Sequence, residues 1–241
     1  MRYAIISDIH ANLEALEAVL ARIAEMGVDQ IVCLGDVVGY NASPNACVDI
    51  IRDREIPTIM GNHDAVACLL EEPWGFNPVA MQAAMWTREQ LSDDNLAWIQ
   101  QLPMHVFTDD FVGVHGAPGD RDMYLFSWED ILPHVAFLDE VDRRICMFGH
   151  THMPGIFSSD GAYSPEDDNR FQLDEDKPFF INPGSVGQPR DGNSRAAFGL
   201  YDSDEHVFEQ VRLTYPVAEA AQRVTDAGLP EFLADRLGLG R

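Results

Sequence analysis

The chain opens with YAIISDIH at residues 3–10, a short apolar run that ends in an aspartate and a histidine. An unbroken apolar run of this length is typical of a buried parallel strand. Apolar residues between positions 13 and 23 then recur at helical spacing, and Gly27 is placed to end that helix. A second run, IVCLGD at 31–36, again ends in an aspartate. This βαβ pattern predicts a parallel sheet with helices packed on it.

The rest of the chain continues to alternate helices and strands. Residues 65–101 are predicted to be a helical, lid-like segment, which Pro and Gly interrupt at 71–78. Because no repeat or low-complexity linker is present, we predict a single domain over residues 1–241. The other predicted elements are helices at 44–54 and 128–138, strands at 56–60, 145–148, 179–181, 196–201 and 207–213, a hairpin at 106–114, a polar surface segment at 158–176, and helices from residue 217 onward.

The balance of charge restricts the partners of the protein. Lys+Arg number 16 against Asp+Glu 40, which gives a formal net charge of −24, and Lys177 is the only lysine. Extended nucleic acid is therefore a poor candidate, because phosphate contacts need clustered Lys and Arg. An anionic substrate would need local positive charge, such as bound metal.

The cysteines and the apolar segments indicate the cellular setting. The four cysteines are widely spaced and form no CxxC pair, which is typical of reduced, buried thiols. No stretch approaches the roughly 18 apolar residues of a membrane span, and the N-terminus lacks the pattern of a signal peptide. We therefore expect a cytoplasmic protein with no membrane partner.

Polar residues with metal-binding side chains follow each of five predicted strands. In open α/β sheets, ligands bind at the carboxyl ends of the strands. The five strand ends therefore predict a common site at one edge. The residues in question are Asp8 and His10, Asp36, Asn62 with His63 and Asp64, His115, and His150 with His152.

Each of these residues taken alone has an ordinary explanation. Asp8 or Asp36 is equally typical of a loop acid or a helix cap, and Gly61-Asn62 is a turn signal. A lone histidine such as His10 is more often a satisfied polar residue than a ligand. Independent ordinary explanations for all five strand ends are improbable together, so the combination is specific although its members are not.

The side chains in this set are those that a two-metal site uses. They are carboxylates, imidazoles and an amide oxygen, with no thiolate. Two-metal sites hold divalent ions roughly 3.5–4 Å apart and clamp the attacking and leaving oxygens of a displacement. Nitrogen and oxygen ligands suit Mn, Fe, Zn, Co or Ni better than Mg. We predict two divalent ions, with manganese as the first candidate.

The same motifs resemble, in order, the signature of the calcineurin-like metallophosphoesterases. The resemblance covers residues 8–152, and NPGSVG at 182–187 is similar to the tail motif of the bacterial and archaeal branch. It implies an α/β fold of four layers, an αββα sandwich in which two mixed β-sheets are flanked by helices. It also implies a dinuclear phosphoesterase in which a hydroxide between the metals attacks phosphorus.

The resemblance assigns a role to each matching residue. His63 is implied as general acid or charge stabiliser near the leaving group, oriented by Asp64, and Asp64 could instead cap the helix that follows. A carboxylate beside an imidazole fixes its tautomer and favours its charged form. The implied metal ligands are Asp8, His10 and His152 for one ion, Asn62, His115 and His150 for the other, and Asp36 for both.

Departures from the signature narrow the substrate class. Protein phosphatases of this superfamily carry Arg after the second-motif aspartate, whereas here Val37 follows Asp36. The chain is more similar to a small prokaryotic subgroup, through GYN at 39–41, FNP at 76–78 and WTR at 86–88. Members of that subgroup are loosely described as phosphoesterases or relatives of diadenosine tetraphosphate hydrolases.

Four residues are candidates for substrate contacts. Tyr40 and Asn41 follow a predicted ligand closely enough to line the pocket, and Arg190 and Arg195 are candidates for a phosphate clamp. Either arginine could equally pair with surface carboxylates. Aromatic residues at 74 and 76 could form a lid that stacks on a nucleobase, although aromatic packing in a helical core is the commoner arrangement.

Three functions are consistent with the sequence. The first is a metal-dependent phosphodiesterase or phosphatase that acts on a small phosphorylated substrate, such as a nucleotide or dinucleoside polyphosphate. The second is a catalytically weak metal-binding scaffold on the same fold, against which the intact His63 argues. The third is a nuclease, which would need basic surfaces that this chain lacks. The sequence leaves the physiological substrate, the native metal pair and a homo-oligomeric state open.

Overall fold

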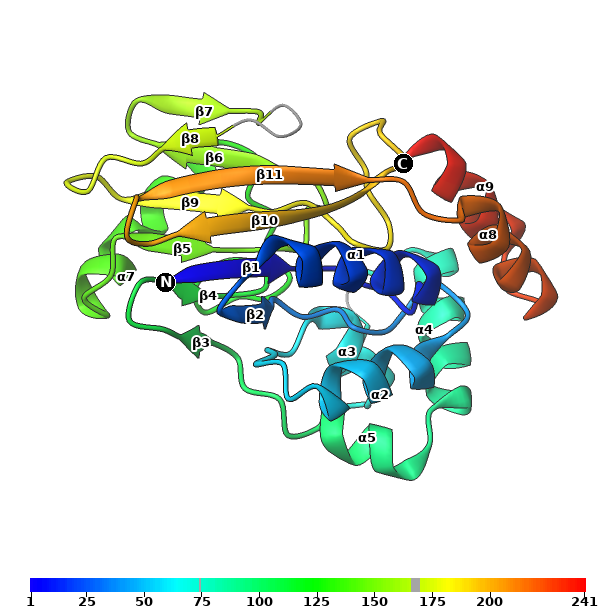
Figure 1. The fold of residues 1–241 in the computed structure, drawn as a ribbon. Helices are drawn as coiled ribbons and strands as arrows, with labels where there is room; N and C mark the ends of the chain where they lie inside the picture. The colour runs from blue at the N-terminus through cyan, green and yellow to red at the C-terminus, as the bar shows by residue number, and fades with distance from the viewer. Residues whose placement is uncertain (74, 166–169) are drawn as a thin grey trace.

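The protein is built on two β-sheets, which the computed structural model describes over residues 1–73, 75–165 and 170–241 (Figure 1). The strands of the first sheet lie in the order β2 (Gln30–Cys33), β1 (Arg2–Ile6), β10 (Ala196–Asp202), β11 (Val207–Leu213) and β8 (Arg170–Gln172). Those of the second lie in the order β3 (Val106–Phe107), β4 (Val112–Gly113), β5 (Ile145–Met147), β9 (Phe179–Asn182), β6 (Gly155–Ser158) and β7 (Gly161–Tyr163).

Both sheets are mixed. In the first sheet β1 pairs with β2 in parallel, as the opening βαβ pattern predicts, but with β10 in antiparallel. In the second sheet β4, β5 and β9 are parallel neighbours, and β6 is antiparallel to β9. The predicted architecture of two mixed sheets flanked by helices is confirmed, whereas an all-parallel sheet is not formed.

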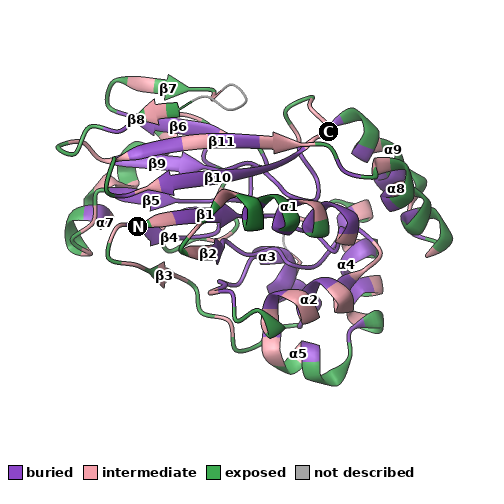
Figure 2. Cartoon of the chain, viewed as in Figure 1, coloured by how far each residue is buried: buried purple, intermediate pink, exposed green. Residues whose placement is uncertain are grey.

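The alternation of side chains along β1 explains the layered packing. Tyr3 and Ile5 point into the core between the two sheets, while Ala4 and Ile6 point into the core beneath the helices. On the far side of the second sheet, Phe180 packs into a third core that includes Leu138. Figure 2 shows the inner strands of both sheets buried along most of their length, whereas β3, β7 and β8 at the edges are partly exposed. The order of layers is therefore helices, sheet, sheet and helices.

Helices cover the outer faces and occupy both ends of the sheets. The first, α1 (Leu13–Met26), begins at Asn12, whose side chain accepts from the N–H of Ala15, and ends at Gly27 with a left-handed φ of 63°. The others are α2 (Pro44–Asp53), α3 (Asn62–Ala67), α4 (Pro78–Gln90), α5 (Asp93–Ile99), α6 (Trp128–Ile131), η1 (Leu132–His134), α7 (Val135–Glu140), α8 (Val217–Asp226) and α9 (Glu231–Leu239). Among the described residues, no helix is long and apolar enough to cross a membrane.

The strand predicted at residues 56–60 is wrong. This segment forms only an isolated parallel bridge, between Thr58 and Cys33. Pro57 has no N–H to donate to a ladder, and the N–H of Met60 donates instead to the carbonyl of Pro103. The segment still runs beside β2 and brings the start of α3 to the same edge of the sheet.

Candidate metal centre

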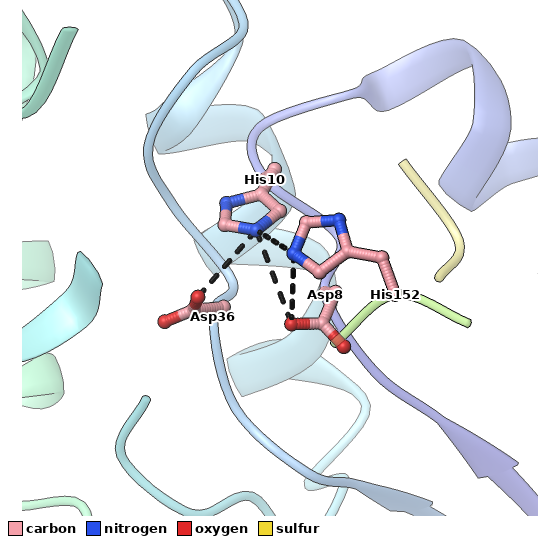
Figure 3. Close-up of side chains that lie close together, drawn as sticks. All are labelled: Asp8, His10, Asp36 and His152. Atoms are coloured by element: carbon pink, nitrogen blue, oxygen red, sulfur yellow. Dashed lines mark hydrogen bonds and ion pairs between the residues drawn. The ribbon is translucent and has the colours of Figure 1, made fainter. Parts of the chain in front are cut away.

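The predicted ligands meet where β1, β2, β4 and β5 end. They form two groups, and within each group all ligand atoms lie within 4.8 Å of one another. The first group is Asp8, His10, Asp36 and His152, and the second is Asp36, His115 and His150. Asp36 belongs to both groups, and all of these side chains are buried. Figure 3 shows the first group, in which the two imidazoles and the two carboxylates face one another.

Short contacts connect the two groups through Asp36. Its Oδ2 lies 3.4 Å from His10 Nε2 on one side and 3.3 Å from His115 Nε2 on the other. On the His10 side, His152 Nε2 lies 3.0 Å from His10 Nε2 and 3.4 Å from Asp8 Oδ1. On the His115 side, Asn62 Oδ1 lies 3.3 Å from His115 Nε2. The arrangement is continuous, with Asp36 at its middle.

A backbone carbonyl holds the second ring nitrogen of each histidine in these groups. His10 Nδ1 contacts Val38 O at 3.0 Å, and His115 Nδ1 contacts Leu34 O at 2.8 Å. His152 Nδ1 and His150 Nε2 make the same kind of contact, with the carbonyls of Gln188 and Asp122. Since a carbonyl only accepts, these nitrogens carry the proton and the opposite nitrogens are left for a ligand bond. Such carbonyl partners are typical of metal-binding histidines.

The left-handed backbone at the strand ends turns these side chains inward. A positive φ is uncommon outside glycine and is often found at functional sites. Here the strain is concentrated on the predicted ligands, with φ values of 53° at Asp8, 50° at His10, 52° at Asp36, 64° at His150 and 60° at His152.

Two glycines allow the strand ends to approach closely. A Cβ on Gly61 would meet Oδ1 of Asp36, and one on Gly149 would meet Oγ of Ser7 and Oδ2 of Asp8. Both lie directly before predicted ligands, Asn62 and His150. Glycine is therefore required at these positions so that the loop backbone can pack against the carboxylates.

The electrostatics of the site indicate a place for cations. Burial raises the pKa of Asp8 to about 7. Burial opposes ionisation of Asp36 and of His115 too, but the two charges stabilise each other: the pKa of Asp36 is held well below its usual range, and that of His115 is raised to about 9. Burial lowers the pKa values of His10 and His152 well below normal, so these rings are neutral lone-pair donors. Asp36 Oδ2 also has no hydrogen-bond partner among the described residues. Buried carboxylates facing imidazoles fit divalent ions, and a bound ion would take the place of the second proton on His115.

A cavity of about 120 Å³ adjoins the second group. Two pairs of rings line it: His63 and Phe76, with centroids 4.5 Å apart, and His150 and Tyr124, with centroids 4.0 Å apart. The break predicted within residues 65–101 thus contributes Phe76 and Asn77 to the cavity, while Trp74 lies outside the described residues. The remaining lining residues are Tyr40, Asn62, Gly75, Ala80 and Asp122.

His63 lies at the cavity, but Asp64 does not orient it. The Asp64 carboxylate accepts from the backbone N–H of Val38 at 3.1 Å and of Gly61 at 3.0 Å. This is the reciprocal half of a capping box at the start of α3, whose N-cap is Gly61 rather than Asp64. His63 Nδ1 has no hydrogen-bond partner in the described part of the chain, and burial lowers the pKa of His63 to about 4. The expectation that Asp64 contacts His63 is therefore wrong.

The four candidate substrate contacts divide into two pairs. The ring of Tyr40 packs 4.7 Å from that of His10, and the guanidinium of Arg190 lies 5.6 Å from the Tyr40 ring, so both lie at the site. Asn41 is buried and donates to the carbonyl of His10 at 2.8 Å, so it supports the loop rather than facing the cavity. Arg195 Nε donates to Oδ1 of Asn193 in the loop before β10. Neither Asn41 nor Arg195 is among the residues that line the cavity, so substrate contacts by these two residues stay predictions.

Three residues at the site were not predicted from the sequence. Asp122 and Tyr124 lie in the loop after β4 and line the cavity, and the Asp122 carbonyl contacts His150 Nε2 at 3.0 Å. The third, Arg236, comes from α9, and its guanidinium lies 5.9 Å from the Tyr40 ring. None of them belongs to a motif, so no sequence signal marked them.

Comparisons with known proteins place this site in a family. The model of the calcineurin-like phosphoesterase superfamily domain matches residues 1–206. The chain belongs to this superfamily. It is therefore a metal-dependent phosphoester hydrolase, as the buried Asp and His groups at its strand ends also indicate.

Individual relatives agree with this assignment. The chain is 38% identical over 245 residues to the uncharacterized protein MJ0912 of Methanocaldococcus jannaschii, covering 99% of this chain and 98% of that protein. It is 26% identical to the phosphodiesterase YfcE of Escherichia coli, covering 85% of this chain and 89% of YfcE. The crystal structure of a metallophosphoesterase from Sphaerobacter thermophilus superposes with a TM-score of 0.88 at 35% identity, covering 100% of this chain and 99% of that one.

Proposed function

We propose that the protein is a dinuclear phosphoesterase that hydrolyses a small phosphodiester, phosphomonoester or nucleotide. The observation that carries this proposal is the position of Asp36, whose Oδ2 lies 3.4 Å and 3.3 Å from imidazoles of the two groups. One ion would be held by Asp8, His10 and His152, and the other by Asn62, His115 and His150, with Asp36 shared. The donor set fits manganese first, and Fe, Zn, Ni or Co as alternatives.

When bound, two divalent ions would supply Lewis-acid chemistry, which makes water more acidic and neutralises charge on a phosphate. The chain supplies positioning. Asp36 Oδ1 accepts from the backbone N–H of His63 at 2.9 Å, so the shared carboxylate also fixes the start of α3. Asp64 secures the same turn through Gly61 and Val38. These contacts hold the His63 ring at the cavity, where it would donate to the leaving-group oxygen.

The cavity supports a small substrate with a flat organic group. Phe76 and Tyr124 both line it, beside His63 and His150 respectively. Aromatic faces stack on nucleobases without regard to sequence. Residues 65–101 would thus act as a lid-like segment over a nucleotide or dinucleoside polyphosphate.

A metal-by-substrate matrix tests this function. Chelator-treated protein is reloaded singly with Mn, Ni, Co, Zn, Fe or Mg, and offered phosphate monoesters, bis-p-nitrophenyl phosphate and dinucleoside polyphosphates. We expect turnover that requires added metal and is greatest with manganese, with two ions bound per chain by elemental analysis. His63→Ala serves as the matched variant, because it removes the cavity side chain and retains the predicted metal ligands.

The other outcomes separate the alternatives. A folded protein that binds two ions but turns over no phosphate ester would support a scaffold. Cleavage of DNA with a steep dependence on salt would support a nuclease.

A further inference from the structure

Arg190 and Arg236 converge on Tyr40 from distant parts of the chain. Their guanidinium carbons lie 5.6 Å and 5.9 Å from the centroid of the Tyr40 ring. That ring in turn lies 4.3 Å from the ring of His63 and 4.7 Å from that of His10. The two arginines thus lie next to the metal centre and the cavity, behind a single aromatic side chain.

The backbone fixes the two arginines relative to each other. The N–H of Gly192, in the loop that carries Arg190, donates to the carbonyl of Gly240 at 2.9 Å, just beyond the end of α9. Arg236 Nε donates to the backbone oxygen of Arg241. Figure 1 shows α8 and α9 beyond the end of the sheets toward which β1 points. The pair is therefore preorganised, which lowers the cost of binding a ligand there.

Among the described residues neither arginine forms an ion pair with an Asp or Glu side chain, although the chain carries 40 acidic residues, and Arg236 donates instead to the backbone oxygen of Arg241. Exposed basic residues such as Arg22, Arg144 and Arg170 do form ion pairs. Arg190 Nη2 instead donates to the neutral amide of Gln188, and its buried Nε has no partner in the described part of the chain. Burial, followed by repulsion from Arg190, lowers the pKa of Arg236 to about 10. Two like charges held near each other repel, and a bound anion would relieve that repulsion.

We propose that Arg190 and Arg236 form a second anion subsite, which binds a phosphoryl group adjacent to the one that is hydrolysed. The substrate class is then a diphosphate or polyphosphate ester. This inference rests on the proposed function, because it takes the metal centre as the site of hydrolysis. Guanidinium groups suit this role because they bind phosphate oxygens through two parallel hydrogen bonds. Arg236 lies outside the residues 1–206 that match the family model, so this feature depends on the C-terminal helices.

Binding of two phosphonates tests the subsite without any need for turnover. Metal-loaded protein is titrated by calorimetry with methylenediphosphonate and with methylphosphonate, and its metal content is measured after each titration. We expect the diphosphonate to bind more tightly than the monophosphonate. The dissociation constant of methylphosphonate divided by that of methylenediphosphonate should therefore fall about tenfold in Arg236→Gln. Arg22→Gln, which removes a charge from the exposed face of α1, should leave the ratio unchanged.

Unchanged ratios in a folded Arg236→Gln protein would overturn the proposal. Arg236→Lys gives a second measurement, because it keeps a charge on α9 and should restore part of the ratio. Hydrolysis of bis-p-nitrophenyl phosphate is measured in parallel. If the protein turns over this diester and Arg236→Gln leaves the ratio unchanged, the subsite is rejected and the proposed function stands. If Arg236→Gln lowers the ratio but the unmodified protein shows no turnover, the anion subsite is supported and the proposed function is rejected.

Discussion

The two ends of the sheets contain similar side chains and organise them differently. At the end where β1, β2, β4 and β5 stop, Asp and His residues converge beside a cavity of about 120 Å³. At the opposite end a larger cavity, of about 330 Å³, is lined by charged residues that include Asp139, Arg144, Lys177 and His206. The larger cavity is not the one with the converging ligand atoms.

Burial accounts for the difference. At the metal end, the side chains of Asp8 and His10 are 0% exposed and have fixed neighbours. At the opposite end, Arg144 and Asp139 form an ion pair with side chains 58% and 71% exposed. Water screens such a pair and its side chains remain free to move. A cluster of exposed charged residues is thus weak evidence for a functional site. Buried carboxylates and imidazoles whose donor atoms face one another are stronger evidence for a metal site.

The largest expected effect comes from Asp36→Asn. The amide keeps the shape and the acceptor for the N–H of His63 but removes the charge between the two groups, so we expect kcat/KM to fall on the order of a thousandfold or more. Turnover of bis-p-nitrophenyl phosphate and metal content per chain are the measurements. A folded variant with two ions and near-normal turnover would show that Asp36 is not shared.

A histidine exchanged at each end gives a second test. His63→Ala should lower kcat roughly a hundredfold or more, because it removes a side chain at the cavity. His206→Ala, at the opposite end beside Glu175, should leave kcat unaltered. Steady-state kinetics give kcat for both variants. Equal losses of kcat would contradict the claim that His63 contributes because it lies at the cavity.

A glycine exchange tests the close packing at the strand ends. In Gly61→Ala the new Cβ would collide with the Asp36 carboxylate, so we expect about 1–3 kcal/mol of destabilisation. Gly238→Ala in α9 has no atom within 4 Å of the new Cβ and should gain roughly 0.5–1 kcal/mol from helix propensity. Thermal unfolding midpoints compare the two, and a stable Gly61→Ala protein would contradict the packing argument.

The smallest effect is expected for Arg144→Ala at the opposite end. Its ion pair with Asp139 is largely exposed, so the loss should be less than about 1 kcal/mol in the free energy of unfolding. Urea denaturation measures this loss. A larger loss, or a change in turnover, would show that the two ends are coupled.

The sequence predicted most of the metal centre because its signal is local. Each predicted ligand follows an apolar run, and the βαβ rule brings the ends of parallel strands to one edge. Asp8, His10, Asp36, His115, His150 and His152 therefore lie together in the structure as expected.

Long-range contacts decided the rest. The sequence could not show that β10 would pair in antiparallel with β1, because pairing between strands about 200 residues apart leaves no local pattern. Nor could it show that the carboxylate of Asp64 would accept from Val38 and Gly61 rather than orient His63, since such a partner is chosen only when loops pack. Arg236 contacts Tyr40 because α9 docks on the loop at 190–193, and a helical pattern predicts that α9 exists but not where it packs. The Asp and His residues that follow the strands in sequence determined that a metal site could form. Tertiary packing decided which neighbouring side chains, such as Arg236, lie beside that site.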